Sequence, residues 1–352
     1  MRLLTTICFN YKPNVAVYFY AYHPNTRPTF TVTPMTLRPE WPNYCTTALM
    51  SKHILLTGGT GLIGRKLTDF LLSKGYQVNH LSRKPGTNPE VNTFLWDVNK
   101  GQIDERCING VDTIVHLAGA NVSDGRWTDK RKKEIIESRT KSIGLIYKLL
   151  KAKPQHTVKS VISASGISYY GDRADNLLTE NSAPGTDFLA NVSLQWEHAV
   201  DGGGGLGLRL VKFRTGIVLD AKGGALPVLA KPVKFGVGAA LGSGKQWVSW
   251  IHMDDVIAMY LFAIENENIN GDYNMVAPNP VTNQQLIKAV AKEVHRPLWL
   301  PKVPGFALEL TLGEMAGVVL SSQKASAQKI EDAGYKFKYP TLMWALKDIY
   351  KS

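Results

Sequence analysis

Short apolar runs and amphipathic stretches alternate along most of this chain. The apolar runs have strand length and fall at residues 54–57, 77–81, 94–97, 111–117, 158–165 and 208–214. Helical stretches lie between them, as at 65–72 and 130–139. Strands that alternate with helices are typical of a parallel sheet with helices on both faces. The pattern therefore predicts an α/β fold with a doubly wound parallel sheet.

A glycine-spaced turn joins the first apolar run directly to the first helical stretch. Gly59, Gly61 and Gly64 fit the pattern Gly-x-Gly-x-x-Gly. In that pattern one glycine makes the tight turn, one lets backbone N–H groups approach a pyrophosphate, and one lets helix and strand pack closely. We therefore interpret the segment as a dinucleotide-binding fingerprint of a Rossmann-type domain. The predicted cofactor-binding residues here are Thr57, Gly58, Gly59, Thr60, Gly61, Leu62, Ile63 and Gly64.

The residues that follow the second apolar run indicate which dinucleotide is bound. An NAD site usually carries an acid about 20 residues after the glycines to hold the ribose 2′-OH, whereas an arginine there suits the 2′-phosphate of NADP. This run ends in Ser82, Arg83 and Lys84, without an acid. We predict that Arg83 clamps the 2′-phosphate, with Ser82 and Arg65 as helpers, because a guanidinium fork matches phosphate oxygens. The alternative is a solvated basic turn. The predicted cofactor is NADP (NADPH).

Two further segments extend the predicted cofactor site. Asp97 ends the third apolar run, where it would meet the adenine; the alternative is an ordinary aspartate at a strand end. The run at 111–117 leads into small residues, and Leu117, Ala118 and Gly119 would let the cofactor pass closely.

The composition limits the classes of protein that fit. The chain has 352 residues, of which 44% are hydrophobic and 20% charged, with a net charge of +12. The basic residues are scattered, and the dense run at 130–133 begins a helical stretch, so we predict a solvated helix face and no nucleic acid. No run reaches the roughly 18 apolar residues of a membrane span, which predicts no membrane partner. Cys8, Cys45 and Cys107 lack metal-ligand or disulfide spacing, so we expect no metal and a reducing, cytoplasmic location.

The first 49 residues differ from the rest of the chain. They contain one acid, Glu40, and no serine, and they match neither a transit peptide nor a signal peptide. Met50 stands just before the first apolar run. We predict that residues 1–49 are a poorly ordered N-terminal extension, and our hypothesis is that they reflect the choice of start codon.

Motifs in a fixed order give the chain a family resemblance. They are TGGTGLIG at 57–64, HLAGA at 116–120, SASGISYYG at 163–171 and WIHMDDV at 250–256. With GRWT at 125–128, LGSGKQW at 241–247 and NMVAP at 274–278, the chain resembles the atypical "epimerase family" branch of the extended short-chain dehydrogenase/reductases. The resemblance covers residues 52 to 350. It implies an NADP(H)-binding, epimerase-like oxidoreductase that acts on a small molecule, with an added C-terminal domain of unknown function.

The resemblance also implies a Tyr-x-x-x-Lys pair, in which the lysine lowers the pKa of a proton-transferring tyrosine. Counting back from Glu197 places Leu189 at the tyrosine position and Ser193 at the lysine position, so both groups are absent. The remaining catalytic candidates are Ser165, Tyr169 and Tyr170, and the alternative for the tyrosines is aromatic packing under a loop. We expect His252 and Asp255 to have structural roles.

These observations predict a domain arrangement. We expect a Rossmann domain at 50–220 with a returning segment at 248–275, and a smaller C-terminal α+β substrate lobe from 221–247 and 276–352. The glycine-rich segment 223–244 is expected to form a loop or short ribbon that covers the pocket. The predicted assembly is a monomer or homodimer. The competing function is a non-catalytic dinucleotide-binding protein with a regulatory or structural role, which the missing Tyr-x-x-x-Lys pair favours.

Overall fold

A computed structural model describes residues 52–351 of the chain. The predicted extension at residues 1–49 lies outside the described residues. None of the helices between residues 52 and 351 combines the length and apolar content needed to cross a bilayer.

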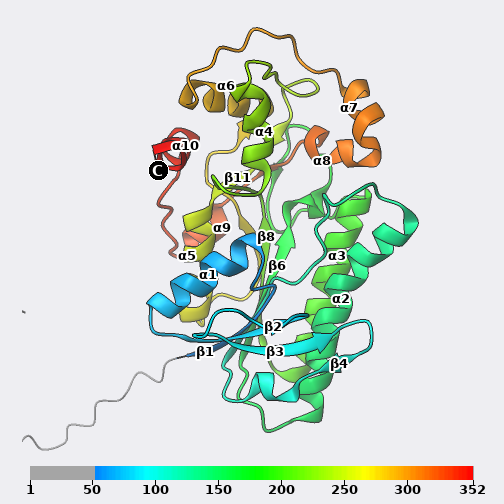
Figure 1. The fold of residues 1–352 in the computed structure, drawn as a ribbon, viewed down its shortest axis with the longest axis vertical. Helices are drawn as coiled ribbons and strands as arrows, with labels where there is room; N and C mark the ends of the chain where they lie inside the picture. Colours follow the sequence, from blue (N-terminus) through cyan, green and yellow to red (C-terminus); the bar gives the residue numbers. More distant parts are fainter. Residues whose placement is uncertain (1–51, 352) are drawn as a thin grey trace, which may run out of the picture. The chain divides into compact units, whose positions relative to one another are not determined.

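An eight-stranded sheet forms the centre of the described structure (Figure 1), with the strand order β12-β8-β6-β5-β1-β2-β3-β4. All neighbouring strands pair in parallel except β3 and β4, which are antiparallel. This order confirms the predicted doubly wound parallel sheet. The strands are β1 (His53–Thr57), β2 (Gln77–Ser82), β3 (Asn92–Asp97), β4 (Gln102–Ile103), β5 (Thr113–His116), β6 (Ser160–Gly166), β8 (Arg209–Thr215) and β12 (Gly271–Met275).

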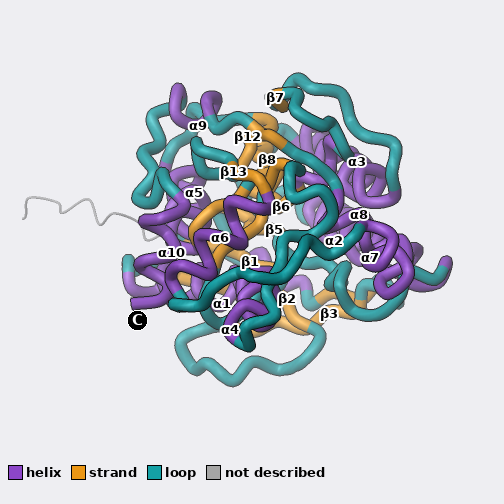
Figure 2. Tube along the Cα trace, turned by 90° about the horizontal axis from the view of Figure 1, so that it is seen from above, coloured by secondary structure: helices purple, strands orange, loops and turns teal. Residues whose placement is uncertain are grey.

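Helices cover both faces of this sheet, as Figure 2 shows in the view from above. One face carries α1 (Leu62–Ser73) and α5 (Met253–Glu265), and the other carries α2 (Asp129–Ala152) and α3 (Phe188–Asp201). Each face has its own hydrophobic core of buried aliphatic and aromatic side chains. Burial on both faces explains why the strands are nearly continuous apolar runs.

Three of these helices have an N-cap residue whose side chain accepts a hydrogen bond from the helix backbone. The side chains of Thr128, Asp187 and His252 accept hydrogen bonds from backbone N–H groups in the first turns of α2, α3 and α5. Such caps satisfy donors that a helix start leaves without a partner, and each stabilises the helix by about 1 kcal/mol. Helix α1 is different, because Gly61 stands at its N-cap and no side chain in the described part of the chain caps it.

A third hydrophobic core belongs to the segments that follow β8. It is formed mainly by α4 (Ala225–Lys234), α6 (Asn283–Glu293) and α10 (Leu342–Lys351), which pack beside the parallel pair β9 (Ile217–Leu219) and β11 (Trp250–His252). The short strands β10 (Trp247–Val248) and β13 (Val281–Thr282) pair antiparallel nearby. Two more helices, α7 (Gly305–Leu312) and α8 (Gly317–Leu320), flank η4 (Gly313–Ala316).

The segment expected to form a loop or ribbon contains helix α4, so that expectation was wrong for Ala225–Lys234. Leu226, Ala230 and Val233 are buried on one helix face, and this apolar stripe outweighs the glycines on either side. Pro227 lies in the first turn, where a missing N–H costs little. Pro232 stands inside the helix, near its end.

Part of the segment assigned to the C-terminal lobe packs with the main sheet instead. Strand β14 (Lys324–Ala325) pairs with β7 (Leu177–Leu178), and α9 (Gln328–Asp332) follows it. Ile330 and Tyr335 lie in the same core as α5 and β12. The Asp255 carboxylate on α5 accepts hydrogen bonds from the Tyr335 hydroxyl at 2.9 Å and from the backbone N–H groups of Lys338 and Tyr339. A buried acid on α5 therefore holds the C-terminal segment, which agrees with the structural role expected for Asp255.

Candidate functional site

The turn between β1 and α1, residues 57–64, is called the glycine turn below. Its shape depends on contacts that only glycine permits. Gly58 has φ +71°, and the Gly61 N–H donates to the Gly58 carbonyl at 3.0 Å. A Cβ on Gly59 would lie 2.4 Å from the His80 ring, and one on Gly64 would lie 2.3 Å from the Gly58 carbonyl oxygen. These two glycines thus let the turn pack onto β2 and onto itself.

Gly61 has a different environment. A Cβ there would meet one atom closely, the Gly58 carbonyl oxygen at 3.2 Å. The first turn of α1, which begins at Leu62 and Ile63, has neither an acidic side chain nor a side-chain cap among residues 52–351. Its N–H groups and the positive end of the helix dipole therefore remain available to an anion. Arg65 steadies the turn, because its Nε donates to the Thr60 carbonyl at 2.7 Å.

The segment after β5 is held against the glycine turn. The buried Thr57 hydroxyl oxygen accepts hydrogen bonds from the backbone N–H groups of Leu117 and Ala118, both at 3.1 Å. Gly119 lies beside a side chain from α2, since a Cβ on it would be 3.0 Å from Arg139 Cζ. The strand register brings Thr57 opposite both Leu81 and His116. The sheet thus gathers the predicted residues of β1, β2 and β5 at one edge.

Arg83 is exposed just beyond the end of β2 and forms no ion pair with any residue that the structure describes. Ser82 pairs with Leu95 in the register of β2 and β3, and its hydroxyl oxygen accepts the Lys84 N–H at 3.2 Å. At the end of β3, Asp97 Oδ1 accepts the N–H groups of Asn99 and Lys100. Asp97 therefore holds a turn, and its contact with adenine stays a prediction.

His80 on β2 was not identified from the sequence, although its ring packs against Gly59 in the glycine turn. Its Nε2 lies 2.8 Å from Thr68 Oγ1, and that hydroxyl donates to the Gly64 carbonyl. Burial lowers the pKa of His80, which favours the neutral ring under the turn. A histidine inside an apolar strand gave no local signal of this role, because the contact with Gly59 arises only when β2 lies beside β1.

The predicted catalytic serine, Ser165, is buried in β6. Its hydroxyl donates to Glu197 Oε1 on α3 at 2.7 Å. Glu197 also accepts from Arg214 on β8, through Nε at 2.9 Å and Nη2 at 2.8 Å. The Ser165 hydroxyl is therefore bound to a buried carboxylate that already has a charged partner, and its catalytic role stays a prediction.

The two predicted tyrosines lie in different environments within the 3₁₀ turn η2 (Ile167–Tyr170). Tyr170 is fully buried; its hydroxyl donates to Asn274 at 2.8 Å and accepts from Arg214 at 3.0 Å. Burial raises the pKa of Tyr170 to about 12. Tyr169 is partly exposed, and its ring centroid lies 3.6 Å from Arg214 Cζ. We call Ser165, Glu197, Arg214, Tyr170 and Asn274 the β6–β8 network.

A pair of hydroxyls that was not predicted lies beyond the end of β6. Ser168 Oγ and Ser193 Oγ are 3.2 Å apart. A Cβ on Gly166 would lie 3.0 Å from the former and 3.5 Å from the latter. Ser168 thus occupies the space beside Gly166.

Two aromatic side chains meet at the start of α3. The ring centroids of Trp127 and Phe188 are 4.9 Å apart, and Lys132 Nζ lies 5.4 Å from the Phe188 ring. Lys132 also pairs with Glu314 of η4 at 2.6 Å. The start of α3 is therefore joined to the start of α2 and to the C-terminal lobe.

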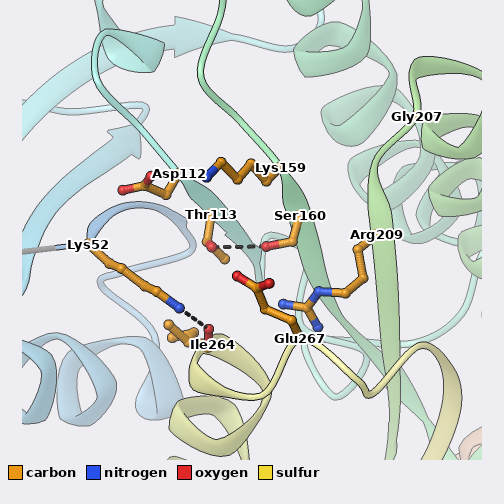
Figure 3. Close-up of a pocket in the computed structure, with 9 residues that line it drawn as sticks. All are labelled: Lys52, Asp112, Thr113, Lys159, Ser160, Gly207, Arg209, Ile264 and Glu267. Atoms are coloured by element: carbon orange, nitrogen blue, oxygen red, sulfur yellow. Dashed lines mark hydrogen bonds between the residues drawn. The ribbon is translucent and has the colours of Figure 1, made fainter. Parts of the chain in front are cut away.

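The opposite edge of the sheet contains a cleft at the amino ends of β1, β5, β6 and β8 (Figure 3). Several of its polar groups are paired within the protein, since Thr113 and Ser160 share a hydrogen bond of 2.9 Å and Lys52 donates to the Ile264 carbonyl. Ligands of parallel sheets bind beyond the carboxyl ends of the strands, so we place no site in this cleft. No cluster of metal-ligating side chains occurs within residues 52–351.

Comparison with known proteins identifies the family of this chain. Residues 54–191 match the NAD dependent epimerase/dehydratase family, and residues 303–349 match a domain of unknown function, DUF1731. The epimerase family protein YfhF of Bacillus subtilis (strain 168) is 37% identical over 299 residues, which are 84% of this chain and 97% of that protein. An epimerase family protein of Staphylococcus aureus (strain NCTC 8325 / PS 47) is 34% identical over 85% of this chain and 99% of its own length.

Solved structures show the same relationship. The human epimerase family protein SDR39U1 (isoform 2), solved with NADPH, is 31% identical with a TM-score of 0.75, over 85% of this chain and 99% of that one. UDP-glucuronic acid 4-epimerase of Bacillus cereus, solved in complex with NAD, shares the fold at 19% identity and a TM-score of 0.66, over 85% of this chain and 98% of that one. The chain therefore belongs to the epimerase family, with an NAD-dependent epimerase/dehydratase region followed by a C-terminal domain of unknown function.

Proposed function

We propose that this protein binds NADPH at the glycine turn and uses it as an epimerase-like oxidoreductase on a small molecule. The observation that carries the proposal is the open, uncapped start of α1 beside Gly61. Free N–H groups, the helix dipole and the absence of nearby acids in the first turn of α1 suit a pyrophosphate. The Leu117–Ala118 backbone, fixed by Thr57, would form the adjoining wall.

The preference for NADPH over NADH is supported at the end of β2. Arg83 is exposed and unpaired among the described residues, and no acid follows the strand at 82–85. An acid there would repel a 2′-phosphate, whereas a guanidinium can bind two of its oxygens. The NADPH complex of the human relative supports the same choice, although more distant neighbours were solved with NAD.

The bound nicotinamide would supply or accept a hydride. The protein groups that we assign to the reaction are Tyr169 and the pair Ser168 and Ser193. Burial raises the pKa of Tyr169, so its phenol stays protonated at neutral pH and can donate a hydrogen bond to a substrate oxygen. The two serine hydroxyls can position that oxygen. Ser165 and Tyr170 hold Glu197 and Arg214, and in this proposal they act through the shape of the site.

A non-catalytic role is the second candidate, and Leu189 and Ser193 favour it. They stand where the resembled reductases carry tyrosine and lysine, and both lie on α3. A protein without that pair could bind the dinucleotide for a regulatory or structural purpose. In either role we propose no nucleic-acid or membrane partner, and a monomer or homodimer.

The test is a calorimetric titration of the full chain with NADPH and NADH side by side, followed by NADPH oxidation across a panel of carbonyl compounds and sugar nucleotides. Tighter binding of NADPH together with substrate-dependent oxidation supports the enzyme. NADPH binding without oxidation of any panel member supports the non-catalytic role. If neither dinucleotide binds, both proposals are overturned.

A further inference from the structure

Two arginines on one face of α2 reach the loop that follows β5. Arg131 Nη2 donates to the Asn121 carbonyl at 2.6 Å, and Arg139 Nη1 donates to the Ala120 carbonyl at 3.1 Å. Their spacing along the sequence corresponds to slightly more than two helical turns, so both side chains leave the same helix face. Two positive charges therefore converge on the backbone between residues 119 and 121, which lies at the carboxyl edge of the sheet.

Arg139 is partly buried and has no acidic partner within residues 52–351. Its Nη1 also donates to the Ile135 carbonyl at 2.9 Å, and its Cζ lies 4.9 Å from the Trp196 ring. Its Nε and Nη2 form no hydrogen bond to any described residue. Arg131 has Glu134 as an ion-pair partner, yet its Nε is buried without a hydrogen bond in the same described range.

Two strongly buried cations of the main sheet, Lys212 and Arg214, show what Arg139 lacks. Lys212 contacts Asp201 and Asp272 at 2.6 and 2.9 Å. Arg214 uses Nε and Nη2, the two donors of one guanidinium edge, on the two oxygens of Glu197. On Arg139 this same edge is without an acid among the described residues. A buried charge normally has a partner, because removing it from water without one is costly.

The electrostatic surroundings agree with this geometry. Burial, and to a smaller extent the positive charge of Arg131, lower the pKa of Arg139 to about 10. An anion beside the Arg139 guanidinium would offset both effects. The face of Trp196 compensates in part, since the π electrons of an aromatic ring attract a guanidinium above it.

The position of Arg139 is the reason to connect it with a ligand. Gly119 has no side chain that would keep the guanidinium away from the loop after β5. Trp196 lies on α3, one turn after Ser193, which we assign to the reaction site. Arg139 thus stands between the predicted path of the cofactor and the helix that borders the substrate.

We propose that Arg139 binds an oxyanion, a phosphate or a carboxylate, between the loop after β5 and α3. The free edge formed by Nε and Nη2 matches two oxygens of such a group. The oxyanion has two sources that share this chemistry, the pyrophosphate of the cofactor or an acidic group of the substrate. The inference rests on the proposed function, because both sources require a dinucleotide at the glycine turn.

The test compares the wild-type full chain with Arg139→Gln and Arg139→Lys, and with Arg106→Gln as a control that removes one exposed positive charge at the other edge of the sheet. Each protein is titrated with NADPH and NADH by calorimetry. The NADPH-loaded proteins are then titrated with inorganic phosphate and with acetate, and both heat and nicotinamide fluorescence are followed. Thermal unfolding shows whether each variant is folded.

If the cofactor supplies the oxyanion, Arg139→Gln should raise the Kd of NADPH and NADH alike by at least about tenfold, a change of about 1.4 kcal/mol. If the substrate supplies it, cofactor affinity stays at the wild-type value, and the loaded wild type binds phosphate or acetate whereas Arg139→Gln does not. Arg139→Lys keeps the positive charge but cannot bind two oxygens as a guanidinium does. Its affinity for the cofactor or the added oxyanion should therefore lie between those of the wild type and Arg139→Gln. If Arg139→Gln does not fold, the affinities of Arg139→Lys serve as the test.

Unchanged cofactor affinity together with unchanged or absent oxyanion binding in the folded variants overturns the inference. Arg139 would then serve only to pack against Trp196 and to hold Ala120. Failure of the wild type to bind either dinucleotide is a separate result, which overturns the proposed function itself.

Discussion

The glycine turn and the β6–β8 network lie at the same edge of the sheet, but they use their polar groups in opposite ways. At the glycine turn the N–H groups of α1 have no cap among the described residues, and Gly61 leaves space beside them. In the network the carboxylate of Glu197 and the guanidinium of Arg214 are buried and bonded to each other. Free donors thus indicate a place for a ligand, whereas polar residues that satisfy one another hold the fold.

The largest effect is expected when the ion pair of the β6–β8 network is removed. Arg214→Leu should lower the free energy of unfolding by about 3–5 kcal/mol, because Glu197 would remain buried without its partner. Urea unfolding followed by circular dichroism measures the change. Arg83→Leu, at an exposed position, should cost less than about 0.5 kcal/mol. A cost below about 1 kcal/mol for Arg214→Leu would contradict the structural role of the network.

Acid should destabilise the protein through His116, which lies beside the network. The Trp196 indole N–H donates to Nδ1 at 3.3 Å, and Nε2 lies 2.8 Å from Ser142 Oγ, so the ring is held neutral. Burial lowers the pKa of His116 from 6.5 to about 3. The unfolded chain therefore binds the proton first, and stability falls by up to about 1.4 kcal/mol per pH unit as the pH drops from 6.5 toward 3.

The measurement is the free energy of unfolding as a function of pH for the wild type and for His116→Gln. The variant is less stable at neutral pH, but its slope between pH 6.5 and 3 should be smaller because the titrating ring is gone. Equal slopes for the two proteins would show that His116 is not held neutral.

Gly61→Val tests whether the dinucleotide binds at the glycine turn. The valine side chain would enter the space that we assign to the pyrophosphate, so NADPH and NADH should both bind at least about 100-fold more weakly, a loss of about 2.7 kcal/mol. Calorimetry measures the affinity, and thermal unfolding should change little because the Cβ has a single close contact. Gly59→Ala is the contrasting variant, and it should lower the melting temperature because its Cβ meets the His80 ring. Wild-type affinity in Gly61→Val would place the cofactor elsewhere.

Arg83→Asp tests whether the protein prefers NADPH to NADH. We expect NADPH to bind at least about thirtyfold more weakly, or about 2 kcal/mol, with little change for NADH, since only NADPH carries the 2′-phosphate. Parallel titrations with both cofactors measure the ratio. Lys151→Asp, which makes the same charge change on the exposed end of α2, is the control. An unchanged ratio would remove Arg83 from the site.

The smallest effects are expected from replacing two serines near the end of β6, Ser165 and Ser168, to which we assign different roles. Ser165→Ala should cost about 1.5 kcal/mol of stability, because its hydroxyl bonds to a charged partner, Glu197. Ser168→Ala should change stability by less than about 1 kcal/mol and should reduce turnover of any substrate found in the panel. Urea unfolding and NADPH oxidation measure the two quantities. The reverse pattern would return the catalytic role to Ser165.

The doubly wound sheet and the glycine turn were predictable from the sequence, because they depend on local periodicity and on glycine at fixed spacing. The family was predictable from a resemblance carried by several motifs in a fixed order. Ser165 and Tyr170 show where local reasoning ends. Their motif was identifiable, but only the pairing of β6 with β8 brings Arg214 beside them. Helix α4 was missed because flanking glycines concealed an apolar stripe that becomes buried only in the C-terminal lobe.

The tertiary structure alone decided which polar groups remain available to a ligand. Hydrogen-bond partners far apart in sequence, such as Ser165 with Glu197 or Tyr170 with Asn274, cannot be inferred from spacing. The same holds for Arg139, whose lack of an acidic partner among the described residues becomes visible only when α2, α3 and the loop after β5 are packed together. A sequence specifies which groups a chain carries, whereas folding decides which of them satisfy one another and which are left for chemistry.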